Sequence, residues 1–128
     1  KFLKDNGVNN IVLIGHSQGA SMPAYSLAKK GHDVTGFVAI GMGAYAEYER
    51  MNSIKALEKI KIPVLDLFGS EDLDAVLSSV DSRAAAAKTA GNNNYTQVKV
   101  ADANHMFDGK EDALLEAVAG WLEDLPAM

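Results

Sequence analysis

The chain has 128 residues, which predicts one domain, residues 1–128, with room for a single hydrophobic core. Hydrophobic residues make up 48% of it and charged residues 23%, and no apolar run approaches membrane-spanning length, so we expect no membrane span. The net charge is −5 and the 12 Lys and Arg residues form no basic stripe, so we expect no nucleic-acid partner. The absence of cysteine excludes disulfides, a thiol nucleophile and thiolate metal sites.

The chain opens on Lys1-Phe2-Leu3-Lys4, which resembles the end of a helix rather than a start with Met or a signal peptide. We therefore expect that the chain has lost its start or is a processed or shortened product. The compartment is not specified by any targeting pattern, and the cytoplasm is favoured.

Apolar periodicity and turn signals predict strands that alternate with helices. The predicted strands cover residues 10–15, 34–40, 62–68 and 95–101. The predicted helices cover residues 1–6, 18–30, 46–60, 75–89 and 111–125. Gly7 is the expected C-cap of the first helix. The alternation predicts an α/β fold with a mainly parallel sheet of about four strands and helices on both faces.

The most informative stretch reads Gly15-His16-Ser17-Gln18-Gly19 and joins an apolar strand to a helix. A serine on such a tight turn is the nucleophile elbow of α/β-hydrolases. We expect that a β-carbon at Gly15 or Gly19 would obstruct the close approach of strand and helix. The N–H of Gln18, at the positive end of the helix, is a predicted oxyanion-hole donor. The alternative is a solvent-facing serine in a glycine-rich loop.

Two further loops that follow predicted strands carry the residue types that a serine nucleophile needs. Asp72 follows the third strand and His105 follows the fourth, so the chain has the order Ser, acid, His of α/β-hydrolases. Because the carboxyl ends of parallel strands share one edge of a sheet, we expect the three residues to lie at that edge. His105 is predicted to accept the Ser17 proton and return it to the leaving group, while Asp72 orients the imidazole.

The chain resembles the C-terminal half of an α/β-hydrolase, from the strand that bears the nucleophile to the final helix. The resemblance rests on Gly-His-Ser-Gln-Gly at 15–19, Pro-Val-Leu-Asp-Leu-Phe-Gly-Ser-Glu-Asp at 63–72 and Asn-His-Met-Phe at 104–107, and it covers essentially the whole chain. It implies that the early strands and the loop that supplies the second oxyanion donor are missing. The nucleophile strand, central in the family, is then expected at an open, apolar sheet edge. Such an edge predicts self-association, most simply as a homodimer.

Other polar residues near these motifs have weaker claims to the site. Glu71 and Asp74 are alternative acids, although the family's spacing favours Asp72. Asp102 and Asp108 bracket His105 and are expected at most to touch it. Asp66, inside a strand, is either exposed or a buried acid, with an ordinary structural role expected.

The remaining candidates concern metal, cofactor and pocket. His16 is expected to pack or hydrogen bond locally, and His32 to lie in a polar turn. Three histidines at these spacings predict no metal site, and we expect no cofactor. The candidate substrate-pocket residues are His16, Met42, Met106 and Phe107, of which the last three also suit the core.

These assignments predict a serine ester hydrolase that forms an acyl-enzyme on Ser17. Residues 44–61 hold one predicted helix where many α/β-hydrolases for long acyl chains carry a cap domain. We therefore expect an open site for a small-molecule substrate, a short or openly accessible acyl ester. The alternative is a catalytically inactive fragment or pseudo-enzyme that serves as a structural or interaction module.

Overall fold

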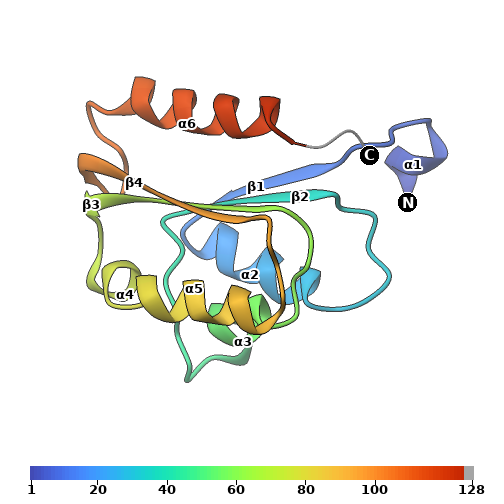
Figure 1. The fold of residues 1–128 in the computed structure, drawn as a ribbon, viewed down its shortest axis with the longest axis horizontal. Helices are drawn as coiled ribbons and strands as arrows, with labels where there is room; N and C mark the ends of the chain where they lie inside the picture. The colour runs from blue at the N-terminus through green and yellow to red at the C-terminus, as the bar shows by residue number, and fades with distance from the viewer. Residues whose placement is uncertain (126–128) are drawn as a thin grey trace.

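The centre of the fold is a four-stranded sheet in the order β1-β2-β3-β4, in which all three pairings are parallel (Figure 1). The computed structural model describes residues 1–125. The strands are β1 (Val12–His16), β2 (Gly36–Ile40), β3 (Val64–Glu71) and β4 (Tyr95–Asn104). The helices are α1 (Phe2–Asp5), α2 (Gln18–Leu27), the 3₁₀ turn η1 (Glu49–Met51), α3 (Ser53–Leu57), α4 (Asp74–Leu77), α5 (Val80–Thr89) and α6 (Glu111–Glu123).

Helix α6 covers one face of the sheet, while α2, α3, α4 and α5 lie on the other (Figure 1). The predicted α/β fold, with a parallel sheet of four strands and helices on both faces, is confirmed. The ends of most predicted elements are shifted by three residues or fewer. Two predicted helices differ more than this.

Alternation along the strands divides the buried residues into two cores. In β2, Phe37 and Ala39 face α2 and α3, whereas Val38 and Ile40 face α6. The α6 core is built from Val38, Ile40, Leu65, Leu67, Ala103 and Phe107. All of β2 is buried, as expected for a strand with helices on both faces.

The register of the strands decides which residues meet at the carboxyl edge. His16 pairs with Ile40, so the next residues along the chain leave β1 and β2 side by side. Strands β3 and β4 continue beyond the end of β2 and remain paired as far as Glu71 and Asn104. The register of this pairing shifts between Gly69 and Glu71. The loops that follow these four strands therefore begin at one edge, with the loops after β3 and β4 starting farther out.

Strand β1 lies at one edge of the described sheet, as expected for the nucleophile strand. The side chain of Ile14 on this strand is 55% exposed. Association with a second copy through this edge stays a prediction.

The extent of the helix predicted over 46–60 is wrong, because the chain forms only η1 and α3 there. The side chain of Asn52 accepts a hydrogen bond from the Lys55 N–H (3.1 Å) and so begins α3 as a new helix. The hydroxyl of Ser53 donates to the buried carbonyl of Gly43 (2.7 Å), which fixes the start of α3 against the chain that leaves β2.

The single helix predicted over 75–89 is divided into α4 and α5. The Ser79 hydroxyl donates to the Ala75 carbonyl (2.7 Å), and the Arg83 guanidinium donates to the Val76 carbonyl (2.7 Å). In a continuous helix these two carbonyls would accept hydrogen bonds from backbone N–H groups, but here side chains donate to both of them.

Asp66 is a buried acid, and it forms an ion pair with Arg83 beneath the sheet. Both side chains have 0% exposure, and the Arg83 Nε donates to Asp66 Oδ2 at 2.7 Å. The Nη2 group donates to the other carboxylate oxygen at 3.3 Å, which makes the pair bidentate. The hydroxyl of Tyr95 also donates to Asp66. This cluster joins β3, β4 and α5.

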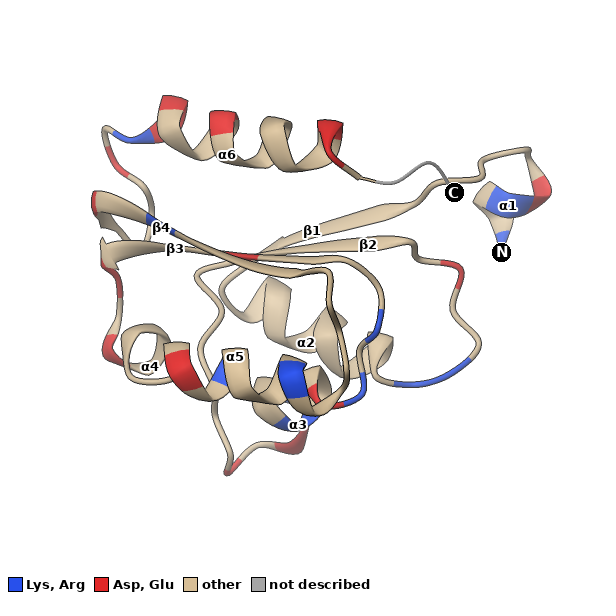
Figure 2. Cartoon of the chain, in the orientation of Figure 1, with Lys and Arg blue, Asp and Glu red and all other residues tan. Residues whose placement is uncertain are grey.

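Charged residues are spread over the described chain. Figure 2 shows acidic residues repeated along α6, whereas Lys and Arg are distributed over helices, strand β4 and loops. Within residues 1–125, no helix has the length and apolar character needed to cross a membrane. The expectation of no nucleic-acid partner stays a prediction.

We expect Arg83→Met to lower the free energy of unfolding by about 3–5 kcal/mol, because it leaves the Asp66 carboxylate buried without its countercharge. The double variant Asp66→Leu/Arg83→Met removes both charges and should lose less than the single variant. Urea denaturation of the three proteins measures both effects. A loss below about 1 kcal/mol for Arg83→Met would contradict the structural role of the pair.

Burial and the neighbouring Asp66 raise the pKa of Tyr95 well above its ordinary value. The unfolded chain ionises this hydroxyl from about pH 10, while the folded chain keeps its proton. The unfolded state then binds fewer protons, so the free energy of unfolding falls as pH rises above about 10, by up to about 1.4 kcal/mol per pH unit. Tyr95→Phe should show a shallower fall than the wild type in urea denaturation at stepped alkaline pH. Equal slopes would contradict this assignment.

Candidate active site

Ser17 lies at the turn between β1 and α2 with φ 59° and ψ −124°, a conformation that residues other than glycine rarely adopt. Its N–H donates to the Ile40 carbonyl at the end of β2 (2.8 Å), which ties the turn to the next strand. The N–H groups of Ala20 and Ser21 donate to the Ser17 carbonyl and begin α2. Among the described residues, the N–H of Gln18 has no backbone acceptor, so it is available to an incoming oxygen.

One of the two glycines of this turn is sterically required. A β-carbon at Gly15 would lie 1.9 Å from the carbonyl oxygen of Gly19. A β-carbon at Gly19 would meet no atom within 4 Å, so the obstruction expected there is wrong for the described chain. The tight approach is between the α-carbon of Gly15 and the backbone of Gly19.

Asp72 follows β3, and its carboxylate is fully buried and accepts three hydrogen bonds. Oδ1 accepts from the Leu73 N–H (2.8 Å) and from Nδ1 of His105 (2.6 Å). Oδ2 accepts from the Gly69 N–H (3.3 Å). The structure therefore brings together two of the predicted site residues, Asp72 and His105.

No other acid near the site hydrogen bonds or ion pairs with the His105 imidazole within the described residues, and this holds for Glu71, Asp74, Asp102 and Asp108. Asp108 instead accepts a hydrogen bond from the Asn104 side chain (3.0 Å). Of the acids weighed from the sequence, Asp72 alone contacts the imidazole in this way.

His105 lies directly after β4 in a loop that its neighbours hold in place. The Asn104 side chain accepts hydrogen bonds from the N–H groups of Met106 (3.0 Å) and Asp108 (3.1 Å). Phe107 has φ 55° and is 1% exposed, so it anchors the loop in the α6 core. The side chain of His105 remains 17% exposed, within reach of a ligand.

Gly41, directly after β2, contributes to the site in a way that the sequence analysis missed. It has φ +60°, and a β-carbon there would lie 3.0 Å from both Cε1 and Nδ1 of His105. The same β-carbon would lie 3.5 Å from Oδ2 of Asp72. A glycine directly after a strand, in the run Gly-Met-Gly, is the signal that could have indicated this close approach.

The hydroxyl of Ser17 makes no hydrogen bond to His105 among residues 1–125. Ser17 and His105 nevertheless lie at the same edge of the sheet. The Ser17 N–H is hydrogen bonded to the Ile40 carbonyl, and the residue after Ile40, Gly41, packs against the His105 imidazole. Nucleophile–base contacts are often longer before substrate binds, and the role of His105 as the base stays a prediction.

The four predicted pocket residues have different surroundings. Met42 has 0% exposure and Phe107 belongs to the α6 core, so neither side chain can touch a ligand in this structure, and core packing is their role. Met106 is 64% exposed beside His105. His16 is half-buried, and its ring lies 4.7 Å from that of His105.

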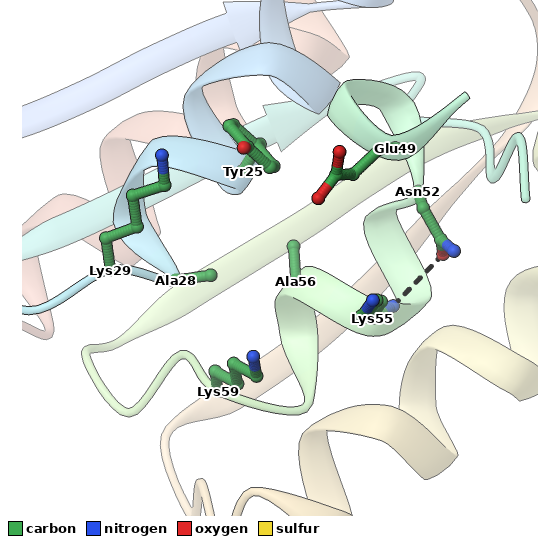
Figure 3. Close-up of a pocket in the computed structure, with 8 residues that line it drawn as sticks. All are labelled: Tyr25, Ala28, Lys29, Glu49, Asn52, Lys55, Ala56 and Lys59. Atoms are coloured by element: carbon green, nitrogen blue, oxygen red, sulfur yellow. Dashed lines mark hydrogen bonds between the residues drawn. The ribbon is translucent and has the colours of Figure 1, made fainter.

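The hollow in Figure 3 lies between α2 and the η1–α3 segment, away from the carboxyl edge. It has a volume of about 180 Å³ and is lined by Tyr25, Ala28, Lys29, Glu49, Asn52, Lys55, Ala56 and Lys59. None of the residues predicted for catalysis or binding lines it. Within the described part of the chain, no group of three or more His, Asp or Glu side chains is placed to hold a metal ion.

A protein-family model described as "Protein of unknown function (DUF3530)" matches residues 1–124. No curated protein matches the chain.

Solved structures similar to the chain include an esterase from Pyrococcus furiosus, with a TM-score of 0.76 and 18% identity over 98% of this chain and 58% of that one. A predicted CIB-like hydrolase from Thermoplasma acidophilum has a TM-score of 0.74 and 20% identity over 97% and 56%. An α/β-hydrolase enzyme from a lagoon-sediment metagenome has a TM-score of 0.72 and 15% identity over 96% and 65%. The chain thus spans less than two thirds of each of these proteins and has the α/β-hydrolase fold.

We expect Gly41→Ala to move His105 away from Asp72, because the new β-carbon would meet the imidazole at 3.0 Å. The NMR signal of the His105 Nδ1 proton should weaken or shift. Gly91→Ala is the matched control, since Gly91 also has a positive φ (+72°) but open space around it. Both variants should lose about 1–2 kcal/mol of stability from backbone strain. An unchanged His105 signal in Gly41→Ala would contradict the close approach.

Proposed function

The chain belongs to the DUF3530 family, whose model covers residues 1–124, and from the site carried by its α/β-hydrolase fold we propose that it is a serine ester hydrolase. The observation that carries the proposal is the 2.6 Å contact between His105 Nδ1 and Asp72 Oδ1, at the edge where Ser17 also lies. A carboxylate accepts hydrogen bonds, so Nδ1 carries the proton and Nε2 is left with a free lone pair. An imidazole in this state can act as a general base.

The proposed reaction proceeds in two halves. The Ser17 oxygen attacks the acyl carbon while His105 Nε2 takes the hydroxyl proton, and the N–H of Gln18 donates to the oxygen that becomes negative. His105 then gives its proton to the alcohol oxygen as the ester C–O bond breaks, leaving an acyl-enzyme on Ser17. A water molecule then attacks the acyl carbon while His105 Nε2 takes a water proton. His105 gives this proton to the Ser17 oxygen as the bond between that oxygen and the acyl carbon breaks, which releases the carboxylic acid and restores the Ser17 hydroxyl.

Asp72 supports the base without taking its proton. Its carboxylate accepts hydrogen bonds from two backbone N–H groups as well as from His105, so its position is fixed from three directions. A carboxylate held in this way keeps the imidazole in one tautomer and stabilises the imidazolium that forms during the reaction.

The proposed substrate class is short or openly accessible acyl esters. Between β2 and β3 the only helical segments of the described chain are η1 and α3. Helix α3 lies on the side of the sheet opposite α6 (Figure 1), and η1 contacts α2 on that same side. No cap element of the described residues covers the carboxyl edge. The exposed side chain of Met106, next to His105, is the proposed contact for the acyl or alcohol group.

A second candidate is an inactive hydrolase-like module that binds a partner. The observation that favours it is the absence, among residues 1–125, of a hydrogen bond between Ser17 and His105. The proposed site also has one identified oxyanion donor, the Gln18 N–H, where acyl transfer ordinarily uses two. The exposed edge of β1, with Ile14 at its centre, is the proposed surface for a second copy under either function.

Hydrolysis of p-nitrophenyl esters of increasing acyl length separates the two candidates. The wild type should hydrolyse the short esters fastest, and Ser17→Ala should fall to the background rate, a loss of up to about 10⁶ in kcat for an intact triad. Ser26→Ala, which removes an exposed hydroxyl from α2, is the control and should match the wild type. Equal rates for the wild type and Ser17→Ala would exclude the esterase and leave the inactive module.

A further inference from the structure

The side chain of His16 links the nucleophile turn to the loop that carries His105. His16 is the last residue of β1, and its Nε2 lies 2.8 Å from the backbone carbonyl oxygen of His105. The two imidazole rings lie 4.7 Å apart, centroid to centroid, with an angle of 35° between their planes. The contact joins residues that are 89 positions apart in the chain.

This contact crosses the whole sheet. Strands β1 and β4 are at opposite ends of the strand order, with β2 and β3 between them. Neighbouring strands are about 4.8 Å apart, so β1 and β4 are separated by roughly 14 Å. Among the described residues, the His16 bond is the one hydrogen bond between residues 16–19 and residues 102–108. This bond is therefore the direct hydrogen-bonded link between the nucleophile turn and the His105 loop.

The other contacts of the His105 loop reach Ser17 only through a further strand, since the imidazole packs against Gly41 and the preceding residue, Ile40, accepts a hydrogen bond from the Ser17 N–H. Asp72 holds the imidazole from β3, and the Asn104 side chain organises the loop internally. Phe107 anchors the loop in the α6 core. None of these groups belongs to β1 or to the turn that follows it.

From this arrangement we propose that His16 is a positioning residue, which holds the His105 loop at the correct distance and angle from Ser17. The proposal rests on the esterase function proposed above. A carbonyl oxygen only accepts, so His16 donates through Nε2–H, and in its neutral form its Nδ1 carries no proton. His16 and His105 thus have opposite tautomers, with the proton on Nε2 in one and on Nδ1 in the other.

The same geometry keeps Nε2 of His16 out of the chemistry. Its Nε2–H is already used by the carbonyl of His105, so it cannot serve as the base for Ser17 through that nitrogen. Its effect is on alignment, and a misplacement of about 1 Å can reduce a catalytic rate by about 10²-fold.

Two variants separate the hydrogen bond of His16 from its ring contact. His16→Phe keeps an aromatic ring beside His105 but loses the donor, whereas His16→Gln keeps an N–H donor and loses the ring. His32→Gln is the control, because His32 is exposed and lies in the turn before β2. Urea denaturation of each variant first tests whether the variant is folded, and its activity is then measured.

We expect His16→Phe to lower kcat for a short p-nitrophenyl ester by about 10²-fold with little change in KM, because alignment and not binding is lost. The rate at which a fluorophosphonate labels Ser17 should fall in parallel. His16→Gln should recover roughly tenfold of this loss, because it restores a donor to the carbonyl. A folded His16→Phe variant that is labelled as fast as the wild type would overturn the proposal.

Nitrogen-15 NMR of the histidines gives a readout that needs no activity. The wild type should show His105 protonated on Nδ1 and His16 on Nε2, and His16→Phe should broaden or shift the His105 signals while Ser17→Ala leaves them unchanged. If the wild type neither hydrolyses esters nor reacts with the fluorophosphonate, the esterase proposal fails, and these signals alone decide whether His16 holds the loop. Unaltered His105 signals in His16→Phe would overturn the positioning role even in an active enzyme.

Discussion

The parallel pairing of all four strands is the constraint on which the candidate site depends. Because β1, β2, β3 and β4 run in one direction, every chain segment that leaves a strand at its carboxyl end does so at the same edge. Ser17 and Gly41 follow the paired residues His16 and Ile40, and Asp72 and His105 follow a second pair farther out. The longer β3 and β4 carry the acid and the imidazole beyond the end of β2. From there the His105 ring packs against Gly41 and approaches the nucleophile turn.

Backbone strain is concentrated at this edge. The residues other than glycine with positive φ in the described chain are Ser17, Asp102 and Phe107, and all three lie in or beside the loops of the candidate site. Each such residue costs of order 1–3 kcal/mol, so the surrounding fold must hold it in place. Phe107 is held by burial of its ring, and Ser17 by the bond of its N–H to β2. The buried ion pair of Asp66 and Arg83 joins β3 to α5 and so stabilises the sheet from which the site loops extend.

The main architecture could be predicted because its signals are local. Apolar runs and turn residues indicated the alternation of strands and helices, and the order of Ser17, Asp72 and His105 placed each at a strand end. The breaks at Asn52 and Ser79 could not be predicted from periodicity, because side chains there take hydrogen bonds that the helix backbone would otherwise make. The partner of Asp66 depends on the packing of α5 under the sheet, which no spacing in the sequence indicates.

The site itself was only partly predictable for the same reason. The contact of Asp72 with His105 could be predicted because the two residues follow neighbouring parallel strands and their types suggest a pair. No motif in the sequence indicates that Gly41 packs against the imidazole or that His16 hydrogen bonds to the His105 carbonyl. Met42 and Phe107 were placed at a pocket because they are adjacent to site residues in sequence. Both side chains are instead buried, Met42 in the core beneath α2 and α3 and Phe107 in the α6 core.

Above all, we propose that the fold makes one serine of the chain, Ser17, nucleophilic. The most direct measurement is tandem mass spectrometry of the protein after treatment with a fluorophosphonate, with heat-unfolded protein as the reference. We expect one phosphonyl group per folded chain, located on Ser17, and none on the unfolded chain. Absence of an adduct on the folded protein, or an adduct on another serine, would contradict it.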